Sequence, residues 1–173
     1  MTLISQSILA QAAVTIERMG TDERLALADE ISLQQPSLLA SVLVLQRMGA
    51  SYPEVEVVLN LLFVIYQAMK LSGYVWPVVS EQTQETCLQR LTARARFQDG
   101  LSPELAQEAV AQQIKNHTEV FLLAYVHGTL GEHDLLAART DPEKYLLLAA
   151  LNLVECVAAT KALKGQSTVA KRL

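Results

Sequence analysis

The densest group of side chains that could do chemistry occupies the eight residues from His127 to Asp134. It holds two imidazoles, His127 and His133, and two carboxylates, Glu132 and Asp134. Imidazoles and carboxylates can ligate a metal ion or form an acid–base pair. With the nearby His117 they define one function hypothesis, a metal-dependent enzyme whose ligands are His117, His127, His133 and Asp134.

The spacing within this segment favours a simpler interpretation. It matches neither His-Glu-x-x-His nor the Cys/His spacing of zinc sites. Gly128 and Gly131 punctuate the segment, as expected for a turn between two helices, where polar residues are common. We therefore expect a solvated connector here, with no catalytic residue, no bound metal and no cofactor.

The rest of the sequence lacks the motifs of common catalytic sites. It contains no Gly-x-Ser-x-Gly elbow, no Gly-rich phosphate loop and no Glu-x-x-His pair. Cys87 and Cys156 are far apart in the sequence, and neither has a histidine close to it along the chain. Such a sparse pair is typical of two half-buried thiols in a reducing cytoplasm. These observations favour a protein without catalytic activity.

Four polar side chains interrupt two long apolar segments: Asn60 and Gln67 in the first, Asn152 and Glu155 in the second. Buried amides need hydrogen-bond partners, so we expect Asn60 and Asn152 to bond across helices and to fix their register. Glu155 is either an exposed edge residue or a buried carboxylate whose pKa burial would raise. Asn60, Asn152 and Glu155 are the predicted polar anchors of a second function hypothesis, a small apolar ligand bound in a helical cavity.

Helices must position these side chains, because proline recurs near the starts and glycine near the ends of the apolar segments. Ser51 and Thr140 each precede a glutamate by three residues, which fits a capping box, and Ser102 suits an N-cap. No segment shows sustained alternation with a period of two, so we expect no sheet.

The sequence thus predicts an all-α fold, a single domain over residues 1–165 with a frayed tail at 166–173. The domain is expected to be an irregular bundle or orthogonal array of about seven helices. The expected helices are Leu3–Met19, Asp22–Gln34, Ser37–Met48, Glu54–Leu71, Glu81–Phe97, Glu104–Val126 and Glu143–Leu163.

Composition adds a localised deficit of charge. Of 173 residues, 51% are hydrophobic and only 18% are charged. The segment Ile31–Ser80 contains just four charged residues, and the helix expected at Ser37–Met48 is apolar on all sides. A helix of that kind is buried on every side or faces a partner. We therefore expect self-association, most simply as a two-fold dimer, through an interface that includes Leu38, Leu39, Val42, Leu45, Met48 and Trp76.

The leading function hypothesis is accordingly a non-catalytic protein–protein interaction or regulatory module that self-associates through residues 31–80. The net charge of −4 argues against binding to nucleic acid. The longest apolar runs are interrupted by polar residues before they reach the length of a membrane span. The N-terminus has no basic segment of the kind that begins a signal peptide, so we expect a cytoplasmic protein.

Overall fold

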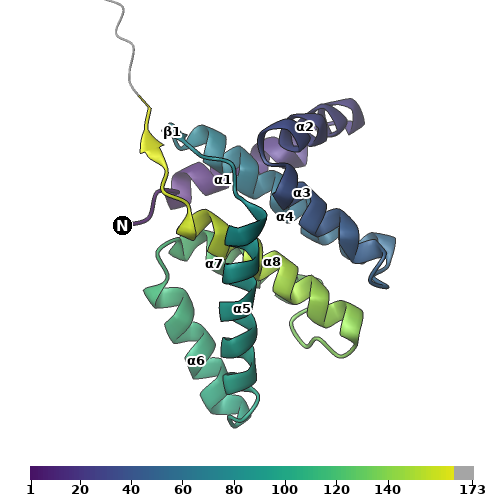
Figure 1. Cartoon of the computed structure of the whole chain (residues 1–173), viewed down its shortest axis with the longest axis vertical. Coiled ribbons are helices and arrows are strands. Elements are labelled where there is room, and N and C mark those ends of the chain that lie inside the picture. Colours follow the sequence, from purple (N-terminus) through teal and green to yellow (C-terminus); the bar gives the residue numbers. More distant parts are fainter. Residues whose placement is uncertain (166–173) are drawn as a thin grey trace, which may run out of the picture.

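The computed structural model describes residues 1–165, and over these residues the chain is all-α, as predicted (Figure 1). The predicted frayed tail, residues 166–173, lies outside the described residues. Eight α-helices are present in the described part where about seven were expected, with one 3-10 turn and two very short strands. The elements are α1 (Gln6–Arg18), α2 (Thr21–Gln34), α3 (Pro36–Leu43), η1 (Val44–Gln46), α4 (Tyr52–Leu71), β1 (Tyr74–Val75), α5 (Glu81–Gln98), α6 (Pro103–Asn116), α7 (Val120–Glu132), α8 (Asp141–Ala159) and β2 (Leu163–Lys164).

Helix α4 forms the centre of the fold. It begins with the predicted capping box: Ser51 Oγ accepts from the backbone N–H of Glu54, and Glu54 Oε2 accepts from that of Ser51 at 2.7 Å. Ten of its side chains are buried, and it packs against α1, α3 and α8. The low charge of residues 31–80 therefore has an explanation within the chain, because its longest helix is enclosed by its own neighbours.

The helix expected at Ser37–Met48 is shorter than predicted and tightens into the 3-10 turn η1. Leu38, Val42 and Leu45, three of the predicted interface residues, point into the core and are at most 2% exposed. Met48 stays 41% exposed, and Leu39 is partly buried against the core. The all-round apolar pattern is thus divided between one face packed against the chain itself and one face left open.

The helix expected at Glu104–Val126 is in fact two helices, α6 and α7, separated by residues 117–119. The cause is tertiary. The Glu119 carboxylate is buried and accepts hydrogen bonds from Thr2 Oγ1 (2.7 Å), the Leu3 N–H (2.8 Å) and the Ile4 N–H (3.2 Å). The Glu119 N–H in turn donates to Nδ1 of His117 at 3.0 Å. These contacts are worth more than continuing the helix, so a periodic apolar pattern is broken by the N-terminal segment.

The last predicted helix also ends early, because the chain leaves α8 at Ala159 and pairs with the segment after α4. Val75 pairs with Leu163 in a short antiparallel ladder, although no sheet was expected. Trp76, the predicted interface anchor, donates from Nε1 to Met69 O at 3.0 Å, so its ring covers the end of α4 and is partly buried. Within residues 1–165, no helix has both the length and the apolar character that crossing a membrane requires.

Candidate functional site

The three histidines lie in three different places. His133 borders an open polar hollow with Arg24 and Asn60, His117 lies beside Glu155, and His127 lines an apolar cavity. Among the described residues, no group of three or more His, Cys, Asp or Glu side chains is close enough to hold a metal ion. The metal-enzyme hypothesis required these histidines to converge, and they do not.

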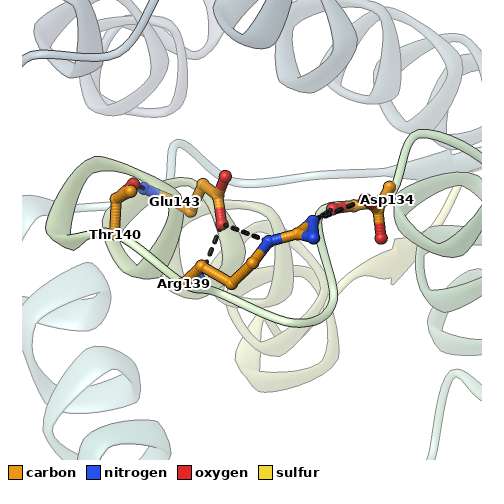
Figure 2. Close-up of polar contacts among 4 residues, drawn as sticks. All are labelled: Asp134, Arg139, Thr140 and Glu143. Carbon is orange, nitrogen blue, oxygen red and sulfur yellow. Dashed lines mark hydrogen bonds and ion pairs between the residues drawn. The ribbon is translucent and has the colours of Figure 1, made fainter.

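The connector expected at residues 127–134 is mostly helical, since α7 continues to Glu132. The loop that follows is held by Arg139, whose guanidinium contacts the carboxylate of Asp134 and lies 3.8 Å from Glu143 Oε2 (Figure 2). Glu143 Oε2 also accepts from the backbone N–H of Arg139 at 2.6 Å, and Thr140 Oγ1 caps α8. Asp134, a metal-ligand candidate, is therefore an exposed loop residue that is paired with a cation.

The two asparagines hydrogen-bond across helices, as predicted. Asn60 Oδ1 on α4 accepts from Nη1 of Arg24 on α2 at 3.0 Å. Asn152 Nδ2 on α8 donates to the Gln84 carbonyl of α5 at 3.2 Å, while its buried Oδ1 has no partner among the described residues. Gln67 is half-buried, and its side chain makes no hydrogen bond within the described part of the chain. Asn60 thus links α4 to α2, whereas Asn152 and Glu155 both link α8 to α5, and the four polar side chains do not line one cavity.

Glu155 on α8 contacts Arg94 on α5 and His117, which lies between α6 and α7. Its Oε1 lies 3.1 Å from Nη1 of Arg94 and 3.6 Å from Nε2 of His117. The contact with His117 holds the pKa of Glu155 below its usual value; burial acts in the opposite direction, and Arg94 lowers the pKa further. The expectation of a raised pKa is therefore wrong, because Arg94 on α5 and His117 between α6 and α7 together outweigh the effect of burial.

A small pocket of about 250 Å³ beside Glu155 is lined by His117 and Cys87, which suggests nucleophilic catalysis at first inspection. The imidazole cannot serve as the base for the thiol, because Nδ1 already accepts from the Glu119 N–H and Nε2 faces Glu155. Burial also raises the pKa of Cys87, and that of the neighbouring Cys156, which keeps both thiols protonated. This arrangement is a structural network.

A second hollow, of about 730 Å³, lies between the start of α2 and α4. Its one arginine, Arg24, is already engaged by Ile16 O (2.8 Å), Met19 O (3.4 Å) and Asn60 Oδ1 (3.0 Å). Glu56 on its wall brings a negative charge beside that cation. We conclude that this wide polar hollow is a solvated surface feature held open by the cap that Arg24 places on α1.

The feature with the chemistry of a binding site is an apolar cavity of about 380 Å³ that lies between α5, α6, α7 and α8 and opens to solvent on one side. That volume falls within the range of small-molecule pockets, which is roughly 300–1,000 Å³. Leucine, alanine, valine and proline side chains dominate the wall, with a few polar groups among them. The lining residues are Leu91, Arg94, Ala95, Gln98, Pro103, Ala106, Gln107, Val110, Gln113, His127, Leu136, Leu147, Leu148 and Leu151.

Helix α6 explains why this volume is open. It begins at the predicted cap, where Ser102 Oγ accepts from the Leu105 N–H at 3.3 Å, yet none of its fourteen residues is buried. Its half-buried stripe includes Ala106, Val110 and Gln113, and these side chains face the cavity. In Figure 1, α5 and α6 run together away from α1 and α4. The apolar face of α6 is therefore turned toward a space that the chain does not fill.

Two polar side chains of the cavity wall stand out. His127 lies on α7, and its Nε2 has no hydrogen-bond partner among the described residues and no contact with solvent. Burial lowers the pKa of His127, so the ring is neutral at physiological pH. Arg94 on α5 is partly exposed and forms an ion pair with Glu155, which is not among the residues that line this cavity. An apolar cavity that contains a few polar groups and a histidine with a shifted pKa has the composition typical of a ligand-binding site.

The sequence presented His127 as a candidate metal ligand within an expected connector, and Arg94 was not among the predicted site residues, so both were missed as cavity residues. The signal that could have found the cavity is the stripe of Ala106, Val110 and Gln113, which is too short and too small to fill a core.

Comparison of the chain with protein-family models, with curated proteins and with solved structures finds no match.

Proposed function

We propose that this protein binds a small apolar ligand in the cavity between α5, α6, α7 and α8 and carries out no catalysis there. The observation that supports the proposal is the face of α6, which lines the cavity and has no buried side chain. The ligand-binding hypothesis from the sequence is retained, with Arg94 as the polar anchor in place of the predicted Asn60, Asn152 and Glu155.

The energetics of the cavity support an occupant. Side chains that line an empty space lose the contacts that packing would give them, and filling the space recovers this energy. Apolar surface removed from water contributes about 25 cal/mol per Å². An apolar molecule that covers Val110 on α6 and Leu148 on α8 at the same time would therefore tighten the contact between the two helices as it binds.

Titration with the neutral fluorophore N-phenylnaphthylamine tests this proposal. Its emission should rise on binding to the wild-type protein and saturate at one molecule per chain. Ala106→Phe places an aromatic ring in the cavity and should reduce the affinity at least about tenfold, the equivalent of roughly 1.4 kcal/mol.

The matched control is Ala111→Phe, the same substitution on the exposed side of α6. It should bind the fluorophore as the wild type does, and the unfolding transitions of both variants show whether each is folded. No saturable binding by the wild type, or equal binding by the two variants, would rule the proposal out.

Self-association is the second candidate function, that of a cytoplasmic interaction or regulatory module. Apolar side chains are exposed around the corner between α3 and α4: Leu43 (51%), Val44 (42%), Met48 (41%) and Tyr52 (75%). A homodimer would cover this corner. Light scattering coupled to size-exclusion chromatography at tens of micromolar should then give a dimer, which Leu43→Glu should dissociate. A wild-type monomer at that concentration would exclude it.

A further inference from the structure

We infer that the occupant of the cavity is an amphiphile with one carboxylate head and an unbranched alkyl chain, the head facing Arg94 and the chain lying against α6 and α8. This inference rests on the proposed function, since it names the chemical class of the ligand bound at the same site. It is argued from the charge, the donors and the volume of the cavity.

The charge of the wall has one sign. Among the described residues that line the cavity, Arg94 is the one charged side chain at neutral pH, and no aspartate or glutamate lines it. The other polar groups are the neutral ring of His127 and the amides of Gln98, Gln107 and Gln113. A cationic ligand would meet no counter-charge in this cavity, whereas an anionic head would meet a guanidinium.

Arg94 has donors to spare for such a head. Within the described residues, the side chain of Arg94 makes one hydrogen bond, in which Nη1 donates to Glu155 Oε1 at 3.1 Å. The Nε and Nη2 hydrogens remain, and a guanidinium presents its donors as a planar fork that matches the two oxygens of a carboxylate. Glu155 is itself contacted by His117, so the carboxylate that pairs with Arg94 is held in place by a second partner.

His127 lines the same cavity but offers no donor to the head group in this conformation. Its Nε2 is buried, lacks a partner among the described residues and is not exposed to the cavity, so a ligand oxygen could accept from it only after neighbouring side chains moved. The ring therefore contributes a neutral part of the wall, and recognition of the carboxylate depends on Arg94.

The volume sets the length of the chain. At about 30 Å³ per non-hydrogen atom, which is the volume of a water molecule in the liquid, a cavity of this size holds roughly a dozen atoms. The cavity measures about 380 Å³. Decanoate, with ten carbons and two oxygens, is therefore a suitable probe, and much longer chains would have to extend past Pro103 or Leu136 at the rim.

Displacement of bound N-phenylnaphthylamine by decanoate, decanol and decylammonium tests the inference on the wild-type protein. Charge-assisted hydrogen bonds should make decanoate bind roughly tenfold more tightly than decanol, with decylammonium the weakest. If decanol binds as tightly as decanoate, the carboxylate inference is wrong while the proposed apolar site stands. If the fluorophore does not bind and none of the three binds by calorimetry, the proposed function fails as well.

Two arginine variants assign the head group to its partner. Arg94→Gln should lose roughly tenfold in affinity for decanoate and keep its affinity for decanol. Arg90→Gln removes a positive charge one turn earlier on α5, beside the small pocket of Cys87 and outside the apolar cavity, and should change neither. Equal losses for acid and alcohol in Arg94→Gln would show that Arg94 only supports the structure, and would overturn the inference.

Discussion

Two regions of the molecule differ in how completely their side chains fill the interior. One is the α4 region, which consists of α4 and the helices packed against it, and the other is the pair α5–α6. Helix α4 buries ten side chains, whereas α5 buries only Cys87 and Leu91, and α6 buries none. A serine N-cap begins α4, α5 and α6 alike, so the capping of the helices does not distinguish the two regions. What differs is the size and number of the side chains aimed inward. The α4 region has enough leucine, isoleucine and valine to fill its interior, and the α6 stripe does not.

This difference teaches where stability and binding reside in one small domain. A filled interior resists change because each lost methylene leaves a cavity. An interior that the chain leaves open contributes little to stability and can accept a ligand, in keeping with the general observation that binding regions belong to the less stable parts of a protein. Variants that act differently in the two regions can break or sharpen this comparison.

The largest effect is expected from truncating leucines in each region. Leu61 on α4 is fully buried, so Leu61→Ala should lower the free energy of unfolding by about 2–5 kcal/mol. Leu148 on α8 already borders the cavity and is half-buried, so Leu148→Ala should cost less than about 1.5 kcal/mol. Urea denaturation of the two variants measures both values. Equal losses would mean that the cavity region is packed as tightly as the α4 region.

The next largest effect is expected at the contact of Glu119 with the N-terminal segment, which we call the joint between the two regions. Glu119→Ala removes the acceptor for Thr2, Leu3 and Ile4 and leaves two backbone N–H groups near the core without a partner. This should cost about 1–3 kcal/mol. Hydrogen exchange at the Leu3 and Ile4 amides should accelerate along with it.

Glu119→Gln keeps one acceptor oxygen at this joint and should recover part of the loss. If Glu119→Ala leaves the exchange of the Leu3 amide unchanged, the N-terminal segment is held by other contacts and Glu119 does not couple the two regions.

The joint also shows what sequence patterns can and cannot predict. Caps act through neighbours along the chain, and Ser51, Ser102 and Thr140 were accordingly recognisable as N-caps from the sequence. The break at residues 117–119 depends on Glu119 meeting Thr2 across more than a hundred residues. No local pattern contains that contact, so the apolar periodicity predicted one helix where there are two.

The candidate site follows the same rule. The amides of Asn60 and Asn152 had to find partners, and that necessity alone predicted bonds between helices. Which polar groups share a cavity depends instead on helix packing. Arg94, His127 and Val110 come from three helices and meet only in the folded chain. Leu38 and Val42 were predicted as interface residues but are buried in the core. The sequence alone does not show whether an apolar residue faces the core or a partner.

A smaller effect is expected from pH at the contact between α8 and α5. Because the pKa of Glu155 is lowered in the folded state, the unfolded chain binds this proton more readily. The stabilisation is therefore complete above the ordinary value of 4.5 and is lost as pH falls through the folded-state pKa. The unfolding free energy of Glu155→Gln should accordingly fall less than that of the wild type between about pH 7 and about pH 3.

Glu104→Gln is the matched control for the pH experiment, since it removes one carboxylate from the exposed start of α6. Its pH dependence should follow that of the wild type more closely than Glu155→Gln does. If Glu155→Gln and the wild type lose stability in parallel as the pH falls, the contacts of Glu155 with Arg94 and His117 do not stabilise the packing of α8 against α5.

The smallest effect is expected in the loop between α7 and α8, where Figure 2 shows Arg139 reaching both Asp134 and Glu143. The side chain of Arg139 is 55% exposed and that of Asp134 is 79% exposed, so water competes for both charges. Arg139→Ala should therefore lower the free energy of unfolding by less than about 1 kcal/mol.

This prediction also locates the boundary between the two regions. The loop carries Leu136, which lines the cavity, next to Leu135, which is 5% exposed and donates its N–H to Leu130 O at 2.9 Å. If Leu135 anchors the loop, Arg139→Ala should leave the affinity for decanoate within about twofold, because apolar burial outweighs an exposed ion pair. Leu135→Ala should reduce both stability and affinity. A larger loss of affinity from Arg139→Ala than from Leu135→Ala would mean that the ion pairs of Arg139 hold the rim of the cavity in place. The well-packed part of the fold would then end at α8 and would not include this loop.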